Sequence, residues 1–168
     1  MQMSAGKALL FLLPIAAYLA LFVATLSLLG FGDQIWLGFV LLWYWGMEKA
    51  AGFEPLVGTV FPGALTGIAT AYLLHTPLEP EAIGTSLAFV LVAFLVLCTL
   101  TGWLKTFVNG ATFLLIMILS VPAIADTADD SEYLNYLGAV VVSSIFIGAT
   151  AWLMSRLRES RSEESATT

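Results

Sequence analysis

Long apolar runs separated by short polar breaks dominate this chain. The runs cover about residues 8–29, 34–49, 56–74, 84–104, 106–125 and 133–157. A helix needs about 20 apolar residues to cross the hydrocarbon core of a bilayer, and every run except the shorter second one reaches that length. The pattern predicts an all-α polytopic membrane protein with six transmembrane helices over residues 1–157. A disordered, polar, cytoplasmic tail is expected over residues 158–168.

Turn-forming residues mark most of the breaks. Gly30 and Gly32 form a tight turn, and Pro55 fits the first turn of the third helix, where its missing N–H costs nothing. The break after the fourth run is the least marked, since only residues 101–105 interrupt the apolar sequence. Treating it as a kink would give five helices. Because residues 84–125 are about twice as long as one crossing, two helices joined by a hairpin at Lys105 are expected.

Basic residues fall on one side of this topology. They precede the first run or lie at or just beyond the ends of the second, fourth and sixth runs: Lys7, Lys49, Lys105, Arg156, Arg158 and Arg161. The other breaks carry acidic residues only. Since loops rich in Lys and Arg stay in the cytoplasm, both termini are expected to be cytoplasmic, in a multi-pass protein of the cell inner (plasma) membrane.

Composition excludes several other classes. The 168 residues are 60% hydrophobic and 11% charged, whereas soluble domains carry about 25% charged residues. No basic footprint for nucleic acid is present. With one His, one Cys and no paired carboxylates within a run, neither an enzyme nor a metal or other cofactor is expected.

An internal repeat relates the third and sixth runs. Residues 69–74, Ala-Thr-Ala-Tyr-Leu-Leu, match residues 149–154, Ala-Thr-Ala-Trp-Leu-Met, at an offset of 80. The same offset pairs Gly63 with Ser143. Because each repeat would contain three helices, the second would be inverted in the membrane, as in many transporters. Chance similarity between helices rich in Ala, Gly and Leu is the alternative.

Candidate pore or substrate residues cluster around helix-breaking positions. Pro62 and Gly63 interrupt the third run, because proline removes one backbone hydrogen bond of a helix. Polar or flexible positions that could line the resulting cavity are Thr59, Thr66, Asn109, Gly110 and Ser143. The alternatives are a structural kink at Pro62 and hydrogen bonding between helices at Asn109.

Small residues elsewhere predict close helix packing. Gly58, Gly67, Gly138 and Gly148 lie within the third and sixth runs. Since a glycine lets another helix backbone approach closely, these positions are expected at helix contacts.

The order of segments resembles a known membrane domain. An aromatic-rich run over residues 35–47 precedes the Gly-rich segment 57–67, and Asn109-Gly110-Ala111-Thr112 precedes Leu137-Gly138-Ala139. This arrangement resembles the six-helix membrane domain of the fusaric-acid-resistance and aromatic-acid-exporter group. It is also similar to small bacterial inner-membrane proteins of unknown function that consist of this domain alone. The resemblance covers residues 8–157 and implies no particular site residue.

Together these patterns indicate a channel or facilitator for a small solute, with an organic anion as one candidate. It would lie in the lipid bilayer as a homo-oligomer. A non-transporting accessory subunit of a larger membrane complex is the alternative, because no charged residue lies deep within any run.

Overall fold

The computed structural model describes residues 5–47, 53–76, 81–125 and 128–166, and in these ranges the chain is helical without any β-strand. The helices are α1 (Ala5–Leu28), α2 (Ile35–Met47), α3 (Phe53–Pro55), the π-helix η1 (Leu56–Val60), α4 (Phe61–His75), α5 (Glu81–Thr101), α6 (Gly110–Leu119), α7 (Pro122–Ala125) and α8 (Asp130–Ala166). The predicted all-α class is therefore confirmed. Lys49, residues 77–80 in the break between the third and fourth runs, Asp126 and residues 167–168 lie outside the described residues.

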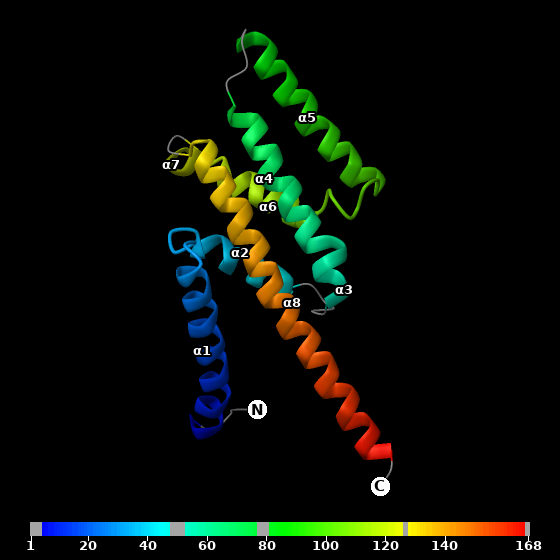
Figure 1. Ribbon diagram of the computed structural model, residues 1–168. Helices are drawn as coiled ribbons and strands as arrows, with labels where there is room; N and C mark the ends of the chain where they lie inside the picture. The colour runs from blue at the N-terminus through cyan, green and yellow to red at the C-terminus, as the bar shows by residue number, and fades with distance from the viewer. Residues whose placement is uncertain (1–4, 48–52, 77–80, 126–127, 167–168) are drawn as a thin grey trace.

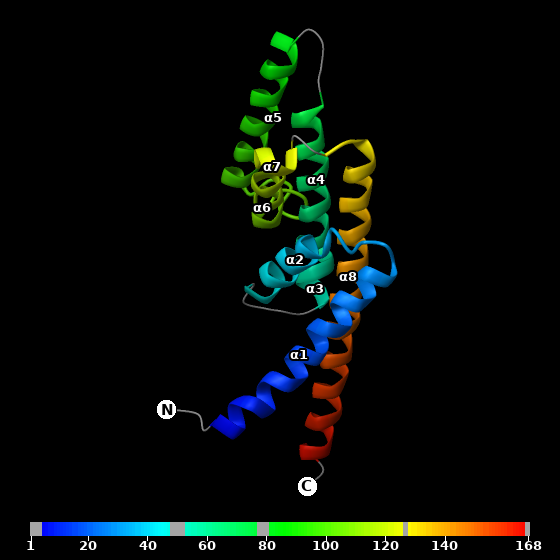
Figure 2. The same cartoon turned by 90° about the vertical axis from the view of Figure 1, so that its left-hand side faces the viewer.

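Two antiparallel helices, α4 and α8, form the centre of the molecule (Figures 1 and 2). Helix α4 packs most extensively against α6, and α8 packs most extensively against α2. Buried side chains from all four helices and from η1 make one core, which includes Leu41, Val60, Ile68, Leu115 and Val140. The core lies where these helices cross one another.

Helices α1 and α5 lie at the periphery, at opposite ends of the molecule in Figure 1. Helix α1 buries Phe22 and Leu26. Among the described side chains of α5, Leu95 and Cys98 are buried, and they join a small second cluster with Val108. Many other apolar side chains on these two helices are exposed.

A π-helical turn precedes Pro62. Over Leu56–Val60 the winding is wider than in an α-helix, and the Phe61 N–H donates to the Leu56 carbonyl five residues earlier. Helix α4 then begins with Pro62 in its first turn. Because proline has no N–H to donate, the regular ladder is interrupted here and the wider turn accommodates the interruption.

The predicted fifth helix, over residues 106–125, is divided. Turns and bends occupy residues 102–109, and α6 begins only at Gly110. Gly102 and Leu104 have φ values of 68° and 56°, left-handed conformations that a right-handed helix does not accept. Pro122 follows the end of α6 at Leu119 and opens the short α7. The remaining helix α6 has 10 residues.

The last helix is longer than the sequence predicts. Helix α8 has 37 residues and continues through residues 158–166, where a disordered tail is the sequence-based expectation. Neither glycine nor proline follows Gly148. Opposite charges three residues apart, as at Arg161 and Glu164, also favour helix.

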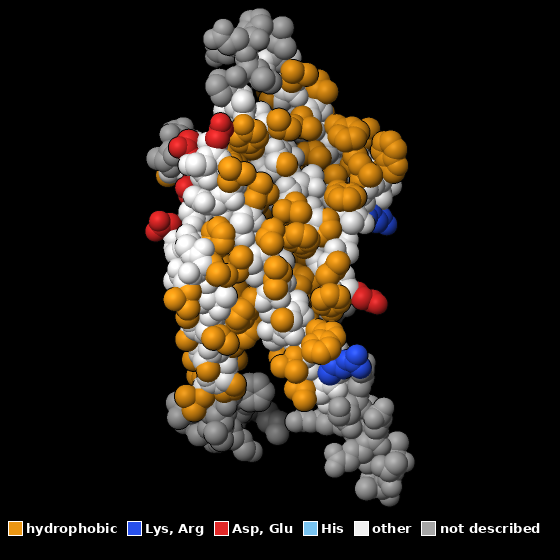
Figure 3. Space-filling view, in the orientation of Figure 1, with side chains coloured by type: hydrophobic (Ala, Val, Ile, Leu, Met, Phe, Trp, Pro, Cys, Tyr) orange, Lys and Arg blue, Asp and Glu red, His pale blue; other side chains and the backbone are white. Residues whose placement is uncertain are grey.

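Two helical stretches are long and apolar enough to cross a membrane, Phe53–His75 and Asp130–Leu157. Shorter apolar helical stretches are Leu12–Leu28, Ile35–Met47, Ser86–Thr101 and Gly110–Leu119. Hydrophobic side chains cover much of the surface in Figure 3. Soluble monomers rarely expose contiguous apolar patches larger than a few hundred Å², so length, composition and surface together fit a membrane protein.

Candidate functional site

The crossing of α4 and α6, which we call the Asn109 crossing, brings the candidate residues Thr59, Gly63 and Asn109 together. Asn109 is the N-cap of α6 because its side-chain Oδ1 accepts a hydrogen bond from the Ala111 N–H at 2.9 Å. The Thr112 hydroxyl in turn accepts from the Asn109 N–H at 3.1 Å, which completes a capping box. The capping box formed by Asn109 and Thr112 therefore explains why α6 begins at this point.

The Asn109 carboxamide also joins two irregular segments. Its Nδ2 donates to the Thr59 carbonyl of η1 at 2.8 Å. The same nitrogen lies 3.2 Å from the Lys105 carbonyl and 3.2 Å from the Thr106 carbonyl, both in the turns before α6. Since every polar atom of this carboxamide has a partner, Asn109 holds the π-helical turn against the start of α6.

Two glycines of α4 allow this close approach. A Cβ atom at Gly63 would overlap the Asn109 carboxamide. A Cβ atom at Gly67 would lie 2.7 Å from the Thr112 carbonyl oxygen, which belongs to the backbone of α6. Both positions therefore require glycine for the observed packing.

The hydroxyls of Thr59 and Thr66 in the third run bond within their own helical stretch. Thr59 Oγ1 donates to the Pro55 carbonyl at 2.7 Å, and Thr66 Oγ1 donates to the Pro62 carbonyl at 2.9 Å. Such back-bonding satisfies the hydroxyl without any partner from another helix. These two candidate hydroxyls are therefore already paired in the structure.

Ser143 lies elsewhere, at the crossing of α2 and α8, which we call the Ser143 crossing. Its side chain is fully buried. A Cβ atom at Gly38 would lie 2.7 Å from Ser143 Oγ and 2.7 Å from Phe22. Within the described residues the Ser143 hydroxyl has no hydrogen-bond partner.

The remaining glycine candidates differ in their surroundings. A Cβ atom at Gly110 would overlap the Tyr44 hydroxyl, and one at Gly138 would lie 2.5 Å from the Phe31 ring. At Gly148 a Cβ atom would lie 3.3 Å from Leu56, whereas Gly58 has open space. Three of these four glycines therefore pack against other elements.

A cavity of about 300 Å³ opens beside the Asn109 crossing. It is lined by Tyr44, Thr59, Cys98, Thr99, Gly102, Lys105, Val108 and Asn109. Five segments contribute: the end of α2, η1, the end of α5, the turns and the start of α6. Tyr44, Cys98 and Thr99 are not among the sequence-based candidates, because each lies in an otherwise apolar run and no motif marks it.

A second polar cavity, of about 520 Å³, lies at the other end of α4. Its lining includes Tyr72, His75, Asp129, Asp130 and Tyr133. Tyr72 donates to Asp130 Oδ1 at 3.1 Å, and His75 Nε2 lies 3.3 Å from Ser120 Oγ. Hydrogen bonds from Ser131 and from the Glu132 N–H hold the pKa of the Asp129 carboxyl below its usual range.

No cluster of three His, Cys, Asp or Glu residues suited to a metal ion occurs within the described part of the chain. The Asn109 crossing is filled by buried side chains, including Ala64, Ile68 and Leu115. The two polar cavities are therefore separated by a packed crossing.

Comparison with known proteins yields no family model, no curated protein and no solved structure that matches this chain.

Proposed function

We propose that this chain is a multi-pass membrane protein that lets a small solute cross the bilayer, as a homo-oligomer, and that the cavity beside Asn109 is part of its path. The main support for this proposal is the position of the polar cavity, which lies where a π-helical turn meets the turns before α6. Irregular backbone is tolerated at membrane depth only where it is buried in protein or lines a cavity. Transporters commonly bind their substrates at such interrupted helices.

Helix lengths support four of the six proposed crossings. Beyond the two long apolar stretches, α1 has 24 residues and α5 has 21. At a rise of 1.5 Å per residue these helices are about 36 Å and 32 Å long, enough for a bilayer core of about 30 Å. Helices α2 and α6, with 13 and 10 residues, are shorter than the core is thick. In the proposed topology they are central helices shielded from lipid by their neighbours.

Helix packing supports the inverted repeat. In the predicted repeat, α4 corresponds to α8 and α6 corresponds to α2. The crossing of α4 with α6 in one half therefore corresponds to the crossing of α8 with α2 in the other, and these are the two most extensive helix crossings. Helices α4 and α8 also run in opposite directions (Figure 1). An inverted repeat of three helices would give both features.

Charge distribution supports the proposed orientation. In Figure 3 the described Lys and Arg side chains lie at the right and lower right. Most described Asp and Glu side chains lie at the upper left, with one acidic side chain on the basic edge. This separation is the pattern that the positive-inside rule generates. Because Lys105 lines the cavity beside the Asn109 crossing, an organic anion is the first solute class to test.

An accessory role in a larger membrane complex is the second candidate. It is favoured by the saturated hydrogen bonding of Asn109 and by the extensive exposed apolar surface of α5. Isolation of the native protein in mild detergent distinguishes the two. A foreign subunit at fixed stoichiometry supports the accessory role, and a homo-oligomer alone argues against it.

Reconstituted liposomes test transport directly. We expect the wild-type protein to pass at least one solute from a panel of weak organic acids, amides and inorganic ions. Asn109→Ala should alter the flux of that solute, because the substitution releases the π-helical turn from the start of α6. Asn135→Ala, on an exposed position of α8, is the matched control and should leave the flux unchanged. Absence of flux for the whole panel would refute the proposal.

A further inference from the structure

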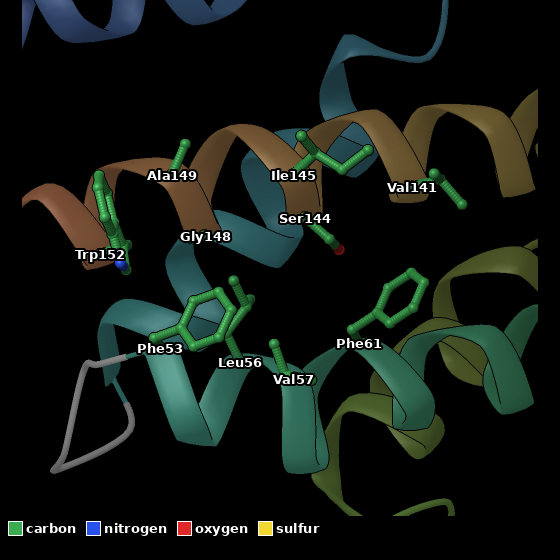
Figure 4. A pocket seen from close by; sticks show the side chains of 10 residues that line it. All are labelled: Phe53, Leu56, Val57, Phe61, Val141, Ser144, Ile145, Gly148, Ala149 and Trp152. Carbon is green, nitrogen blue, oxygen red and sulfur yellow. The ribbon is translucent and has the colours of Figure 1, made fainter.

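An apolar groove runs between α8 and the α3–η1–α4 segment, away from both polar cavities. Its volume is about 490 Å³. One wall carries Phe53, Val57 and Phe61, and the other carries Ser144, Ala149 and Trp152 (Figure 4). Its rim is open, since Val57, Ile145 and Trp152 are 50%, 67% and 52% exposed.

The length of the groove matches one leaflet of a bilayer. It extends along α8 from Val141 to Trp152, eleven residues apart. At 1.5 Å per residue this is about 16 Å, which is roughly half of a hydrocarbon core about 30 Å thick. A ligand lying along it would therefore reach from a membrane surface to the bilayer centre.

A basic residue lies at one end of the groove. The Arg156 guanidinium is positioned over the Trp152 ring, 5.5 Å from its centroid. Tryptophan is enriched at the depth of lipid headgroups. Basic residues on the cytoplasmic side of a membrane protein attract anionic headgroups.

We propose that this groove binds one acyl chain of an anionic phospholipid of the inner leaflet, with the lipid phosphate beside Arg156. The assignment rests on the membrane topology proposed above and is independent of solute transport. A volume near 490 Å³ is within the usual range of small-ligand sites, about 300–1,000 Å³. A partner helix about 10 Å wide and 16 Å long would occupy roughly 1,200 Å³, so the groove matches the volume of an extended chain more closely than that of a helix.

Ser144 provides a way to distinguish an acyl chain from a polar ligand. Its side chain is 9% exposed, its hydroxyl lacks a protein partner within the described residues, and it points into the groove (Figure 4). A hydrocarbon chain does not use this hydroxyl, whereas a ligand with a carbonyl at that depth would accept a hydrogen bond from it.

Native mass spectrometry of the full chain in mild detergent tests the proposal. The protein would be incubated with phosphatidylglycerol or phosphatidylcholine carrying identical acyl chains. We expect one retained phosphatidylglycerol per chain and about fivefold weaker retention of phosphatidylcholine, the effect of about one basic residue near an anionic headgroup. Arg156→Gln should remove this preference. Equal retention of the two lipids by the wild-type protein would overturn the proposal.

Groove-filling variants locate the bound chain. Ala149→Phe should lower retention of phosphatidylglycerol at least about tenfold, since loss of two buried methylene groups is sufficient for that change. Leu153→Phe, at an exposed position of α8 that does not line the groove, is the control and should retain the lipid. Unchanged retention by Ala149→Phe would exclude this groove. Loss of retention in Ser144→Ala would exclude an acyl chain at that depth.

The outcome is separable from the transport assay. Lipid retention without solute flux would refute the proposed transport and leave the groove assignment intact. Flux without specific retention of phosphatidylglycerol would refute the groove assignment alone.

Discussion

The Asn109 crossing and the Ser143 crossing are equivalent in the proposed repeat, yet a polar side chain is hydrogen-bonded at the first and has no partner among the described residues at the second. At the first, the carboxamide of Asn109 bonds to carbonyls of two irregular segments. At the second, the Ser143 hydroxyl has no partner among the described residues. A hydroxyl within a helix can donate to a carbonyl of its own helix, as Thr66 does to Pro62, but the Ser143 hydroxyl makes no such bond. The carboxamide of Asn109 bonds across to the Thr59 carbonyl of the π-helical turn, so at this crossing irregular backbone supplies the partner from another segment.

The largest difference between the two crossings should appear in the free energy of unfolding when their glycines are substituted. Gly67→Ala places a Cβ atom 2.7 Å from a backbone carbonyl of α6, and backbone adjusts poorly. We expect a loss of about 1–3 kcal/mol in the free energy of unfolding. Gly38→Ala meets the side chains of Phe22 and Ser143, which can shift, so its loss should be smaller. Thermal unfolding in detergent measures both.

Gly58→Ala is the control for these substitutions. Nothing lies within 4 Å of its Cβ position, so the unfolding midpoint should stay unchanged or rise slightly. A fall as large as that of Gly67→Ala would show that the close approach of α6 is not the cause.

The two polar side chains should respond in opposite directions to alanine. Asn109→Ala removes an N-cap and the bond to Thr59, and we expect a loss of about 1–2 kcal/mol in unfolding free energy. Ser143→Ala removes an unpaired buried hydroxyl and should be neutral or stabilising by up to about 1 kcal/mol. Urea unfolding in detergent measures the difference. Equal losses would mean that Ser143 has a hydrogen-bond partner in solution.

The smallest expected effect concerns the start of α8. Asp129 accepts hydrogen bonds from Ser131 and from the Glu132 N–H, which lower its pKa below the usual 3.8. A lowered folded-state pKa means that this contribution to stability is present above about pH 3.8 and is lost as pH falls through the lowered value. Melting temperatures between pH 6 and pH 3 should therefore fall slightly less in Asp129→Asn than in the wild type. Identical pH profiles would contradict the assignment.

Local signals in the sequence predicted part of the Asn109 crossing. Pro62 marked the interruption of the third run, because a missing N–H is a property of the residue itself. Gly63 and Asn109 were candidates on the same kind of local argument. The hydrogen bond from Asn109 to Thr59, fifty residues away, could not be predicted, because neither local sequence indicates which distant segment it packs against.

The boundaries show the same limit. The apolar run over residues 106–125 predicted one helix, whereas left-handed backbone at Gly102 and Leu104 and the capping box at Asn109 delay the start of α6 to Gly110. The capping pair Asn109 and Thr112 is visible in the sequence. It competes with a strong hydrophobic signal, and hydrophobicity alone does not report helix ends.

By itself the sequence determined the all-α class, because apolar runs of this length must satisfy their backbone groups within helices. It also determined where charge falls along the chain. Only the tertiary structure decided that α4 crosses α6 while α8 crosses α2, that the amide of Asn109 is saturated, and that an open apolar groove runs along α8. Those features depend on which helix faces pack together, and small apolar residues are compatible with many such packing arrangements.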